Sequence, residues 1–472
     1  MKAASVKNAD INAGYLGNLT TEEENTLRQL WSRLLEAFEF TRDDGNEQEQ
    51  QQQHDKQTIS QASSGPVGSV KRTMTAKSSS TLNGGGSLTM TANELREAWL
   101  GMVKNEDPDS LLLRFLRARK WDVTAAFNML KSALIWRVKE VNVDRLMLEG
   151  EPWCLAREKN KDGGEEEAHE YLEQLRCGKV YMRGEDRQGR PVGYVHVALH
   201  KPGQQSQETI EKLVVQTIEM ARCLFTPPNE SFCVVFDMTN FSLSNMDWQP
   251  VRFIIRAFEA NYPECLGRML IHNAPWIFSG IWKIIRGLLD PVVAAKVDFT
   301  RNAQDLERHI AKENIISRVG GQDNWTYEYI EPSEDEDKLL ADTDTREKIM
   351  NDRREIAGRF LAATQDWIRH LDAQESEEAA IQKKLRDNCI ESLAANYWRL
   401  DPYVRSRNLI DRWGILKPDG KVDPYPDRNT ASNAVEETKV RDGDVGTGTG
   451  TGTGTRGDTG VAVHQEVVAA AG

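Results

Sequence analysis

The sequence lacks the cysteine spacing typical of disulfide-rich and zinc-binding proteins. Six cysteines are scattered along 472 residues, and none forms a CxxC pair. Cys233 and several others lie in apolar runs, where buried thiols are expected. The start, MKAASVKNADINAG, has no apolar region of the kind found in signal peptides. We therefore expect a reduced, soluble, cytoplasmic protein.

The sequence also lacks an apolar run of transmembrane length, which requires about 20 residues. The segment Pro275–Pro291 comes closest, because Lys283 and Arg286 are the only charged side chains between positions 276 and 289. A helix that is apolar on nearly every side is either buried or in contact with lipid. One of these two environments is predicted for this segment.

Hydrophobic residues are scarce for a chain of this length, at 39%. The shortage lies in two regions, 43–92 and 430–472, which are rich in Gln, Ser, Gly and Thr. Such composition predicts disorder, so we expect residues 1–92 to be mostly disordered apart from an amphipathic helix at 20–39, and 430–472 to be a disordered tail. In that helix, Thr21 and Glu24 fit a capping box. The net charge of −13 argues against binding of nucleic acid.

The remaining sequence divides into three patterned regions. Residues 93–150 predict a helical subdomain, and residues 340–425 predict a C-terminal helical extension that packs on the 20–39 helix. Between them, within 175–325, apolar strands alternate with helices. This alternation predicts an α/β fold with a mostly parallel sheet covered by helices. The expected strands are Val192–Leu199, Phe232–Phe236, Met269–His272 and Val297–Phe299, and the expected helices between them are 207–225, 247–260 and 276–289.

Motifs of common α/β enzymes are missing. No GxGxxG follows a strand, and neither GxxxxGK[ST] nor HExxH occurs. Cys177 and Arg183 are separated by the five residues of a tyrosine-phosphatase loop, but the intervening GKVYM has one glycine, at the wrong end. A chance match is the better interpretation. No catalytic residue, metal or cofactor is predicted.

The segment LLLRFLRARKWDV, residues 111–123, concentrates basic residues among apolar ones. Arg114, Arg117, Arg119 and Lys120 fall within seven positions. Two interpretations remain open from the residues alone. The basic face is either solvated, or it contacts a phosphate or another acidic headgroup.

Five segments occur in an order that resembles a known family. They are RFLRARKWDV, DRQGRPV, VVFDMTNFS, NYPECLGRMLIHNAPWIFSGIW and LLDPVVAAKV. Together, from about 95 to 321, the chain resembles the CRAL-TRIO lipid-binding family, of the yeast phosphatidylinositol-transfer type. The resemblance implies a helical N-terminal subdomain and an α/β domain whose sheet floors a large apolar pocket closed by a gate helix. The flanking segments look more loosely like a fungal branch of that family.

The resemblance also implies roles for individual residues. Hydroxyl residues that hold phosphatidylcholine in one well-known family member are replaced here by Phe232 and Val234, so a sterol or another neutral lipid is the expected second ligand. Val293 stands where a threonine often joins the inositol site, so a looser site or a different ligand there is expected. The implied sites are an inositol headgroup site (Arg119, Lys120, Glu264, Lys296), a pocket wall (Phe232, Val234, Phe236) and a gate helix that contacts membranes (Trp276, Phe278, Ile281, Trp282, Ile285, Leu289).

These expectations describe a non-enzymatic, monomeric protein that exchanges phosphatidylinositol and a second apolar lipid between cytoplasmic membrane faces. Contact with the membrane would be transient, with the endoplasmic reticulum, endosomes or lipid droplets as candidates. A lipid-sensing scaffold that presents phosphatidylinositol to a lipid kinase is the alternative. An α/β enzyme is a third hypothesis, and its support is limited to fold class and the spacing of Cys177 and Arg183.

Overall fold

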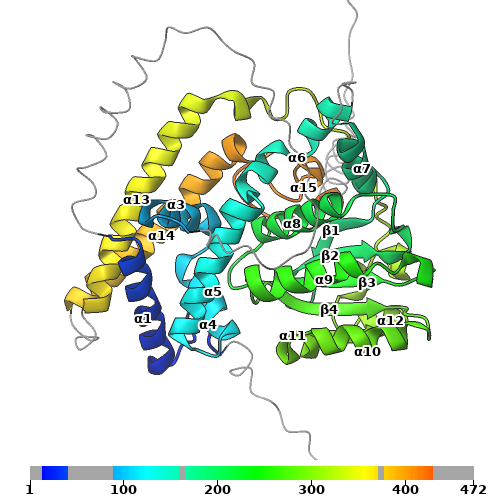
Figure 1. The fold of residues 1–472 in the computed structure, drawn as a ribbon, viewed down its shortest axis with the longest axis horizontal. Coiled ribbons are helices and arrows are strands. Elements are labelled where there is room, and N and C mark those ends of the chain that lie inside the picture. Colours follow the sequence, from blue (N-terminus) through cyan, green and yellow to red (C-terminus); the bar gives the residue numbers. More distant parts are fainter. Residues whose placement is uncertain (1–12, 41–88, 159–164, 370–376, 429–472) are drawn as a thin grey trace, which may run out of the picture. The chain divides into compact units, whose positions relative to one another are not determined.

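A layer of helices lies beside a five-stranded sheet in the computed structural model (Figure 1). The structure describes residues 13–40, 89–158, 165–369 and 377–428. The predicted disorder of 43–92 and 430–472 therefore falls, except for 89–92, outside the described residues. The described residues up to Tyr425 belong to one compact unit.

The sheet has the order β1-β2-β3-β4-β5, in which β1 is antiparallel to β2 and the other neighbours are parallel. This confirms the predicted mostly parallel sheet. Four strands match the expected ones, whereas β1 was not among the expected strands. The strands are β1 (Val180–Glu185), β2 (Pro191–His196), β3 (Phe232–Asp237), β4 (Leu266–His272) and β5 (Val297–Thr300).

Helices precede, separate and follow the strands, as expected for the α/β fold class. Before the sheet come α1 (Thr21–Ala37), α3 (Ala92–Val103), α4 (Pro108–Ala118), α5 (Val123–Ile135), α6 (Val143–Glu158) and α7 (Glu165–Arg176). Between and after the strands come α8 (Gln207–Cys223), α9 (Trp248–Arg256), α10 (Phe278–Leu288), α11 (Pro291–Ala295), α12 (Ala303–Leu306), α13 (Thr343–Arg369), α14 (Glu377–Val404) and α15 (Leu409–Arg412).

Side-chain caps fix where several helices begin. The capping box of α1 is formed by Thr20 and Glu23, one residue before the predicted pair Thr21 and Glu24. The run TTEEE fits both registers, and the fold selects the earlier one. Asp122 caps α5, since its carboxylate accepts a hydrogen bond of 2.9 Å from the backbone of Ala125.

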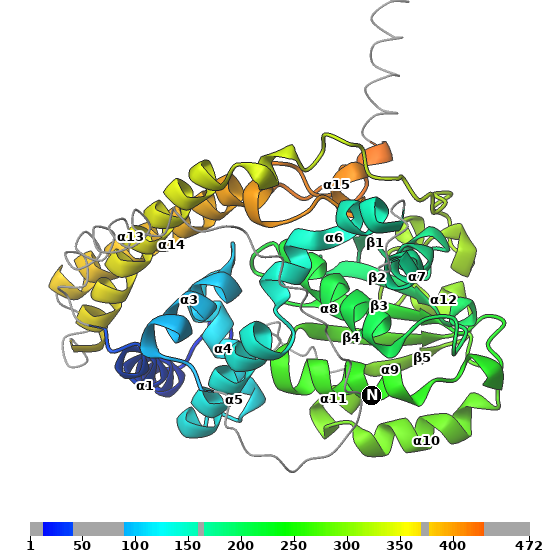
Figure 2. The same cartoon turned by 45° about the horizontal axis from the view of Figure 1, so that its top comes forward.

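The C-terminal helices α13 and α14 run side by side and pack on the N-terminal helices (Figure 2). Trp31 of α1 lies in edge contact with Phe360 of α13, with ring centroids 5.3 Å apart. Its indole donates a 2.6 Å hydrogen bond to Asp109, whose carboxylate also pairs with Arg386 of α14 at 2.7 Å. The expected contact between the 20–39 helix and the C-terminal helices is therefore present, and all of these side chains are buried.

The two faces of the sheet have different coverings. Cys233 and Val235 of β3 lie in a core cluster with Leu306, Ile310 and Ile315, which follow the last strand. The alternate residues of β3 lie on the other face, below α8 and α9. Among the described residues, no helix is long and apolar enough to cross a membrane.

Candidate functional site

A large apolar pocket lies between the sheet and the helices α8, α9 and α10. Its atom-free space, open mouth included, is about 1620 Å³. Phe232, Val234 and Phe236, the three residues predicted to line a pocket, all lie on its wall. They occupy alternate positions of β3, so their side chains share one face of the sheet.

Helix α10 contributes one face to this pocket. Phe278, Trp282 and Ile285 of the predicted gate residues line the pocket, as does Leu289 just beyond the helix. Ile281 packs beside them against the cluster of buried residues that contains Phe278. These positions follow a helical repeat of three or four residues. The described helix, Phe278–Leu288, is shorter than the expected 276–289.

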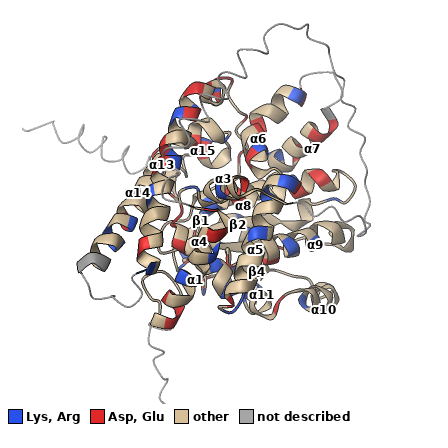
Figure 3. Ribbon diagram, turned by 60° about the vertical axis from the view of Figure 1, so that its left-hand side comes forward, with Lys and Arg blue, Asp and Glu red and all other residues tan. Residues whose placement is uncertain are grey.

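The opposite face of α10 is exposed, although its side chains include large apolar ones. Ile284 is 56% exposed and Leu288 46%, and Trp276, just before the helix, is 86% exposed. Figure 3 shows α10 without acidic residues, and its two charges are Lys283 and Arg286. The segment was expected to be apolar on nearly every side and either buried or in contact with lipid, but the structure gives it an inner apolar face and an exposed outer face that mixes apolar and basic residues.

Two of the four predicted headgroup residues lie together at the start of adjacent strands. Glu264 precedes β4, and its carboxylate accepts a 3.0 Å hydrogen bond from the ammonium of Lys296, which precedes β5. Glu264 also adopts a left-handed backbone with φ of 59°, which is uncommon for a residue other than glycine. Arg119 and Lys120 lie exposed at the end of α4, and among the described residues no hydrogen bond or ion pair joins them to Glu264 or Lys296.

A buried charge cluster supports the loop that carries Glu264. The Tyr262 hydroxyl donates a 2.9 Å hydrogen bond to Glu219 of α8. Burial would raise the pKa of Glu219, but the charges of Arg137, Lys104 and Arg222 outweigh it and hold this pKa well below its ordinary value. The cluster therefore connects the helical layer to the loop before β4.

Comparison with known proteins identifies the fold family. Residues 27–132 match the N-terminal CRAL/TRIO domain, and residues 175–321 match the CRAL/TRIO domain. A CRAL-TRIO domain-containing protein of Schizosaccharomyces pombe is 39% identical over 432 residues, which is 86% of this chain and 93% of the relative. The chain belongs to the CRAL-TRIO family. The phosphatidylinositol transfer protein CSR1 of Eremothecium gossypii is also 39% identical, over 68% of this chain and 71% of its own length.

In this CRAL-TRIO chain an arginine of the basic motif, Arg117, lies near the candidate headgroup site, although it was not among the four predicted headgroup residues. Arg117 of α4 pairs with Glu230 at 2.9 Å, donates to the carbonyl of Gly14 at 2.9 Å, and its guanidinium lies 3.9 Å from the ring centroid of Tyr15. Burial raises the pKa of Tyr15, Arg117 opposes this shift, and the carboxylate of Glu264 adds to it. The N-terminal segment around Tyr15 therefore lies beside both Arg117 and Glu264. The basic motif pointed to Arg117, but its contact with residues about 100 positions away is visible only in the fold.

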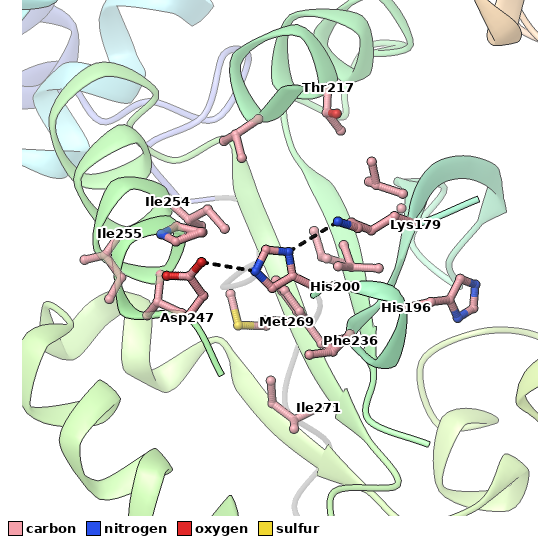
Figure 4. Close-up of a pocket in the computed structure, with 18 of the residues that line it drawn as sticks. Lys179, His196, His200, Thr217, Phe236, Asp247, Ile254, Ile255, Met269 and Ile271 are labelled. Carbon is pink, nitrogen blue, oxygen red and sulfur yellow. Dashed lines mark hydrogen bonds and ion pairs between the residues drawn. The ribbon is translucent and has the colours of Figure 1, made fainter. Parts of the chain in front are cut away.

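A second polar group lines the CRAL-TRIO pocket itself. Lys179, His200 and Asp247 are joined in a row, as Figure 4 shows. These residues come from three separate connections of the chain. No motif in the sequence marks them, and sequence reasoning missed all three.

The geometry around Cys177 and Arg183 does not resemble a phosphatase site. Arg183 is buried and forms an ion pair of 3.0 Å with Asp323. Burial raises the pKa of the Cys177 thiol, which disfavours the reactive thiolate. Among the described residues, no group of three or more His, Cys, Asp or Glu could hold a metal ion.

Proposed function

We propose that this protein binds phosphatidylinositol and a second, apolar lipid in the pocket, and exchanges them between cytoplasmic membrane faces without covalent chemistry. One observation carries the proposal. A largely apolar pocket is covered by a helix that turns Trp282 and Ile285 inward and exposes Ile284 and Leu288 outward. The relative named as a phosphatidylinositol transfer protein, at 39% identity, supports it.

In this proposal α10 acts as a gate at a membrane. The exposed Trp276, Ile284 and Leu288 would enter the lipid interface, where amphipathic helices bind through apolar side chains. Opening of α10 would expose the pocket to the bilayer. Lipid chains would then be retained by apolar burial, worth about 25 cal/mol per Å². The net charge of −13 keeps docking on acidic membranes weak and therefore reversible.

The pair Glu264 and Lys296 is proposed to select the inositol headgroup, with Arg119 and Lys120 as additional cations. Lysine and arginine can satisfy a phosphodiester, while a carboxylate accepts hydrogen bonds from inositol hydroxyls. On binding, the ammonium of Lys296 would exchange part of its contact with Glu264 for the lipid phosphate.

The test is transfer of labelled phosphatidylinositol between donor and acceptor liposomes, together with mass spectrometry of lipids that co-purify with the protein. Transfer by the protein alone is expected. The proposal would be contradicted if phosphatidylinositol neither co-purified with the protein nor was exchanged in the liposome assay. A Cys177→Ser variant is expected to keep full transfer, and loss of activity in it would instead support an enzyme.

A lipid-sensing scaffold remains a second candidate because α14 exposes apolar side chains one turn apart. Ile381 is 58% exposed and Leu385 43%, and a partner such as a lipid kinase could pack on them. A scaffold would stimulate its partner while moving little lipid by itself. The same liposome assay therefore separates the two functions.

A further inference from the structure

A lysine is buried in the wall of the pocket. Lys179 lies directly before β1 and is 6% exposed. Its ammonium donates a hydrogen bond to the side-chain oxygen of Gln174 and another, of 3.3 Å, to Nδ1 of His200. Nε2 of His200 then donates to Asp247 at 3.3 Å. Two of the three ammonium protons are used in this way, which leaves one donor for a ligand.

No carboxylate touches this ammonium among the described residues, since Asp247 is reached only through the imidazole. Burial lowers the pKa of Lys179 to about 8, so the ammonium form still predominates at neutral pH. Burial and the charge of Lys179 both lower the pKa of His200, which Asp247 partly offsets, so the imidazole is a neutral acceptor there. A buried cation without a contacting anion is costly unless something else supplies the negative charge.

This group and the pair Glu264 and Lys296 lie at opposite ends of the strands. Glu264 and Lys296 precede β4 and β5, whereas His200 follows β2, and Lys179 precedes the antiparallel strand β1. The seven residues of β4 separate the two ends, a span of roughly 20 Å. The pocket between them is lined by apolar residues such as Met269 and Ile271 (Figure 4).

We propose that Lys179, supported by His200 and Gln174, binds the carboxylate of a long-chain fatty acid whose chain lies in the apolar pocket. This inference rests on the proposed lipid-binding function and assigns the chemical class of the second lipid. It makes that lipid a carboxylic acid rather than the sterol or neutral lipid expected from sequence.

The shape of the site favours a carboxylate over a phosphodiester. One free ammonium donor suits a single small anionic group at the end of an apolar chain. A phosphodiester carries the same single negative charge on a bulkier group that is also bonded to a polar headgroup, and one ammonium donor leaves more of its oxygen atoms unpaired. A neutral hydroxyl could accept the hydrogen bond but would leave the buried charge uncompensated.

The experiment compares two ligands that differ only in charge. Delipidated full-length protein is titrated with labelled palmitic acid and with its methyl ester, and phosphatidylinositol uptake is measured in parallel. The wild type is expected to bind the acid about tenfold or more tightly than the ester, the size of one charge-assisted hydrogen bond. Lys179→Met is expected to lose this preference while taking up phosphatidylinositol normally, which also reports on its folding.

Thr217→Val is the matched control. Thr217 lines the same pocket, and its hydroxyl already donates a 2.7 Å hydrogen bond to the Leu213 carbonyl. This variant is expected to keep the preference for the acid.

Each other result has a distinct meaning. Equal binding of acid and ester by the wild type, with normal phosphatidylinositol uptake, overturns the carboxylate site and leaves the proposed function standing. Equal loss of palmitate and phosphatidylinositol in Lys179→Met overturns it in favour of a phospholipid contact, provided that circular dichroism shows the variant folded. If that variant is unfolded, Lys179→Leu and His200→Leu must remove the preference instead, or the proposal is wrong. Failure of the wild type to bind any lipid removes the proposed function itself.

Discussion

The ammonium of Lys296 lies 3.0 Å from the carboxylate of Glu264, across the starts of two neighbouring strands. Both side chains keep some access to solvent, at 20% and 16% exposure. The pair thus presents a cation and a hydrogen-bond acceptor side by side, as the proposed headgroup site requires. In the free protein each satisfies the other, so a ligand must replace part of that contact.

Removing either member of this pair should weaken loading with phosphatidylinositol. Lys296→Ala and Glu264→Ala are each expected to reduce uptake about tenfold or more, since each would lose one hydrogen bond to or from a charged group. Palmitate binding should not change, because Lys179 lies at the opposite ends of the strands from Glu264 and Lys296. Mass spectrometry of co-purified lipids measures the effect. Unaltered phosphatidylinositol content in both variants would mean that the headgroup binds elsewhere.

Charged residues on the inner face of α10 should abolish lipid exchange. Ile281→Asp combined with Trp282→Glu places two carboxylates on the face of α10 that packs against the pocket, and the cost of burying them keeps the gate from closing. The fold, measured by circular dichroism and urea unfolding, should remain largely intact. If the variant simply unfolds, α10 is a permanent part of the core and the gate mechanism is wrong.

Polar substitutions on the outer face of α10 should weaken membrane binding without affecting lipid that is already bound. Ile284→Ser with Leu288→Ser removes two exposed apolar side chains that do not line the pocket. Liposome binding is expected to fall by roughly tenfold or more, because full burial of each side chain in the interface would contribute about 1.5–3 kcal/mol. Lipid already bound should be retained. Equal transfer rates for this variant and the wild type would exclude membrane contact through this face.

The strands of the fold were predictable where apolar residues run continuously. Strands β2, β3 and β4 satisfy this condition over most of their length because each lies between two neighbours in the sheet, whereas the edge strand β5 is short and contains Asp298. Strand β1 does not, since it contains Arg183 and Glu185. The charge of Arg183 is neutralised by Asp323, 140 residues later, and no local pattern contains that information.

Those parts of the candidate site that lie on a single strand or a single helix were predictable from the sequence. Alternation along β3 and helical spacing in α10 place their pocket-lining residues on single faces. Lys179, His200 and Asp247 behave differently, because each is an isolated polar residue in its own segment. They meet only after the sheet is assembled, so their proximity depends on the fold as a whole.

Preference for the fatty acid should decline as pH rises from about 7 to about 9, because the Lys179 ammonium has a pKa of about 8 and loses its proton in this interval. The groups that face it are Cys177 on its own segment, His200 after β2 and Asp247 before α9. The pKa of Cys177 is raised and that of His200 lowered, so neither gains a charge that replaces the ammonium. Ionisation of the ligand affects wild type and Lys179→Met equally, so the difference between their pH profiles reports on Lys179. A preference independent of pH would contradict the role of Lys179.

Loss of the buried charge on Glu219 should destabilise the protein strongly. Glu219→Gln leaves Lys104, Arg137 and Arg222 without one of their partners, and breaking a buried ion cluster costs about 3–5 kcal/mol. The pKa of Glu219 is lowered in the folded protein. Its contribution to stability is therefore complete above the pKa of the unfolded chain, near 4.5, and is lost as pH falls through the lower folded value. Urea unfolding at neutral pH measures the difference between variant and wild type.

The matched control for this variant is Glu167→Gln, which breaks an ion pair with Lys212 at the surface. Those two side chains are 45% and 34% exposed, and exposed pairs contribute about 0–1 kcal/mol because water and salt screen them. The two glutamate variants change the same number of atoms and the same charge, so only burial distinguishes them. Equal losses would show that the cluster around Glu219 does not depend on its charge. A large loss confined to Glu219→Gln should also weaken phosphatidylinositol uptake at sub-denaturing urea, since Glu219 holds Tyr262 in the loop that carries Glu264.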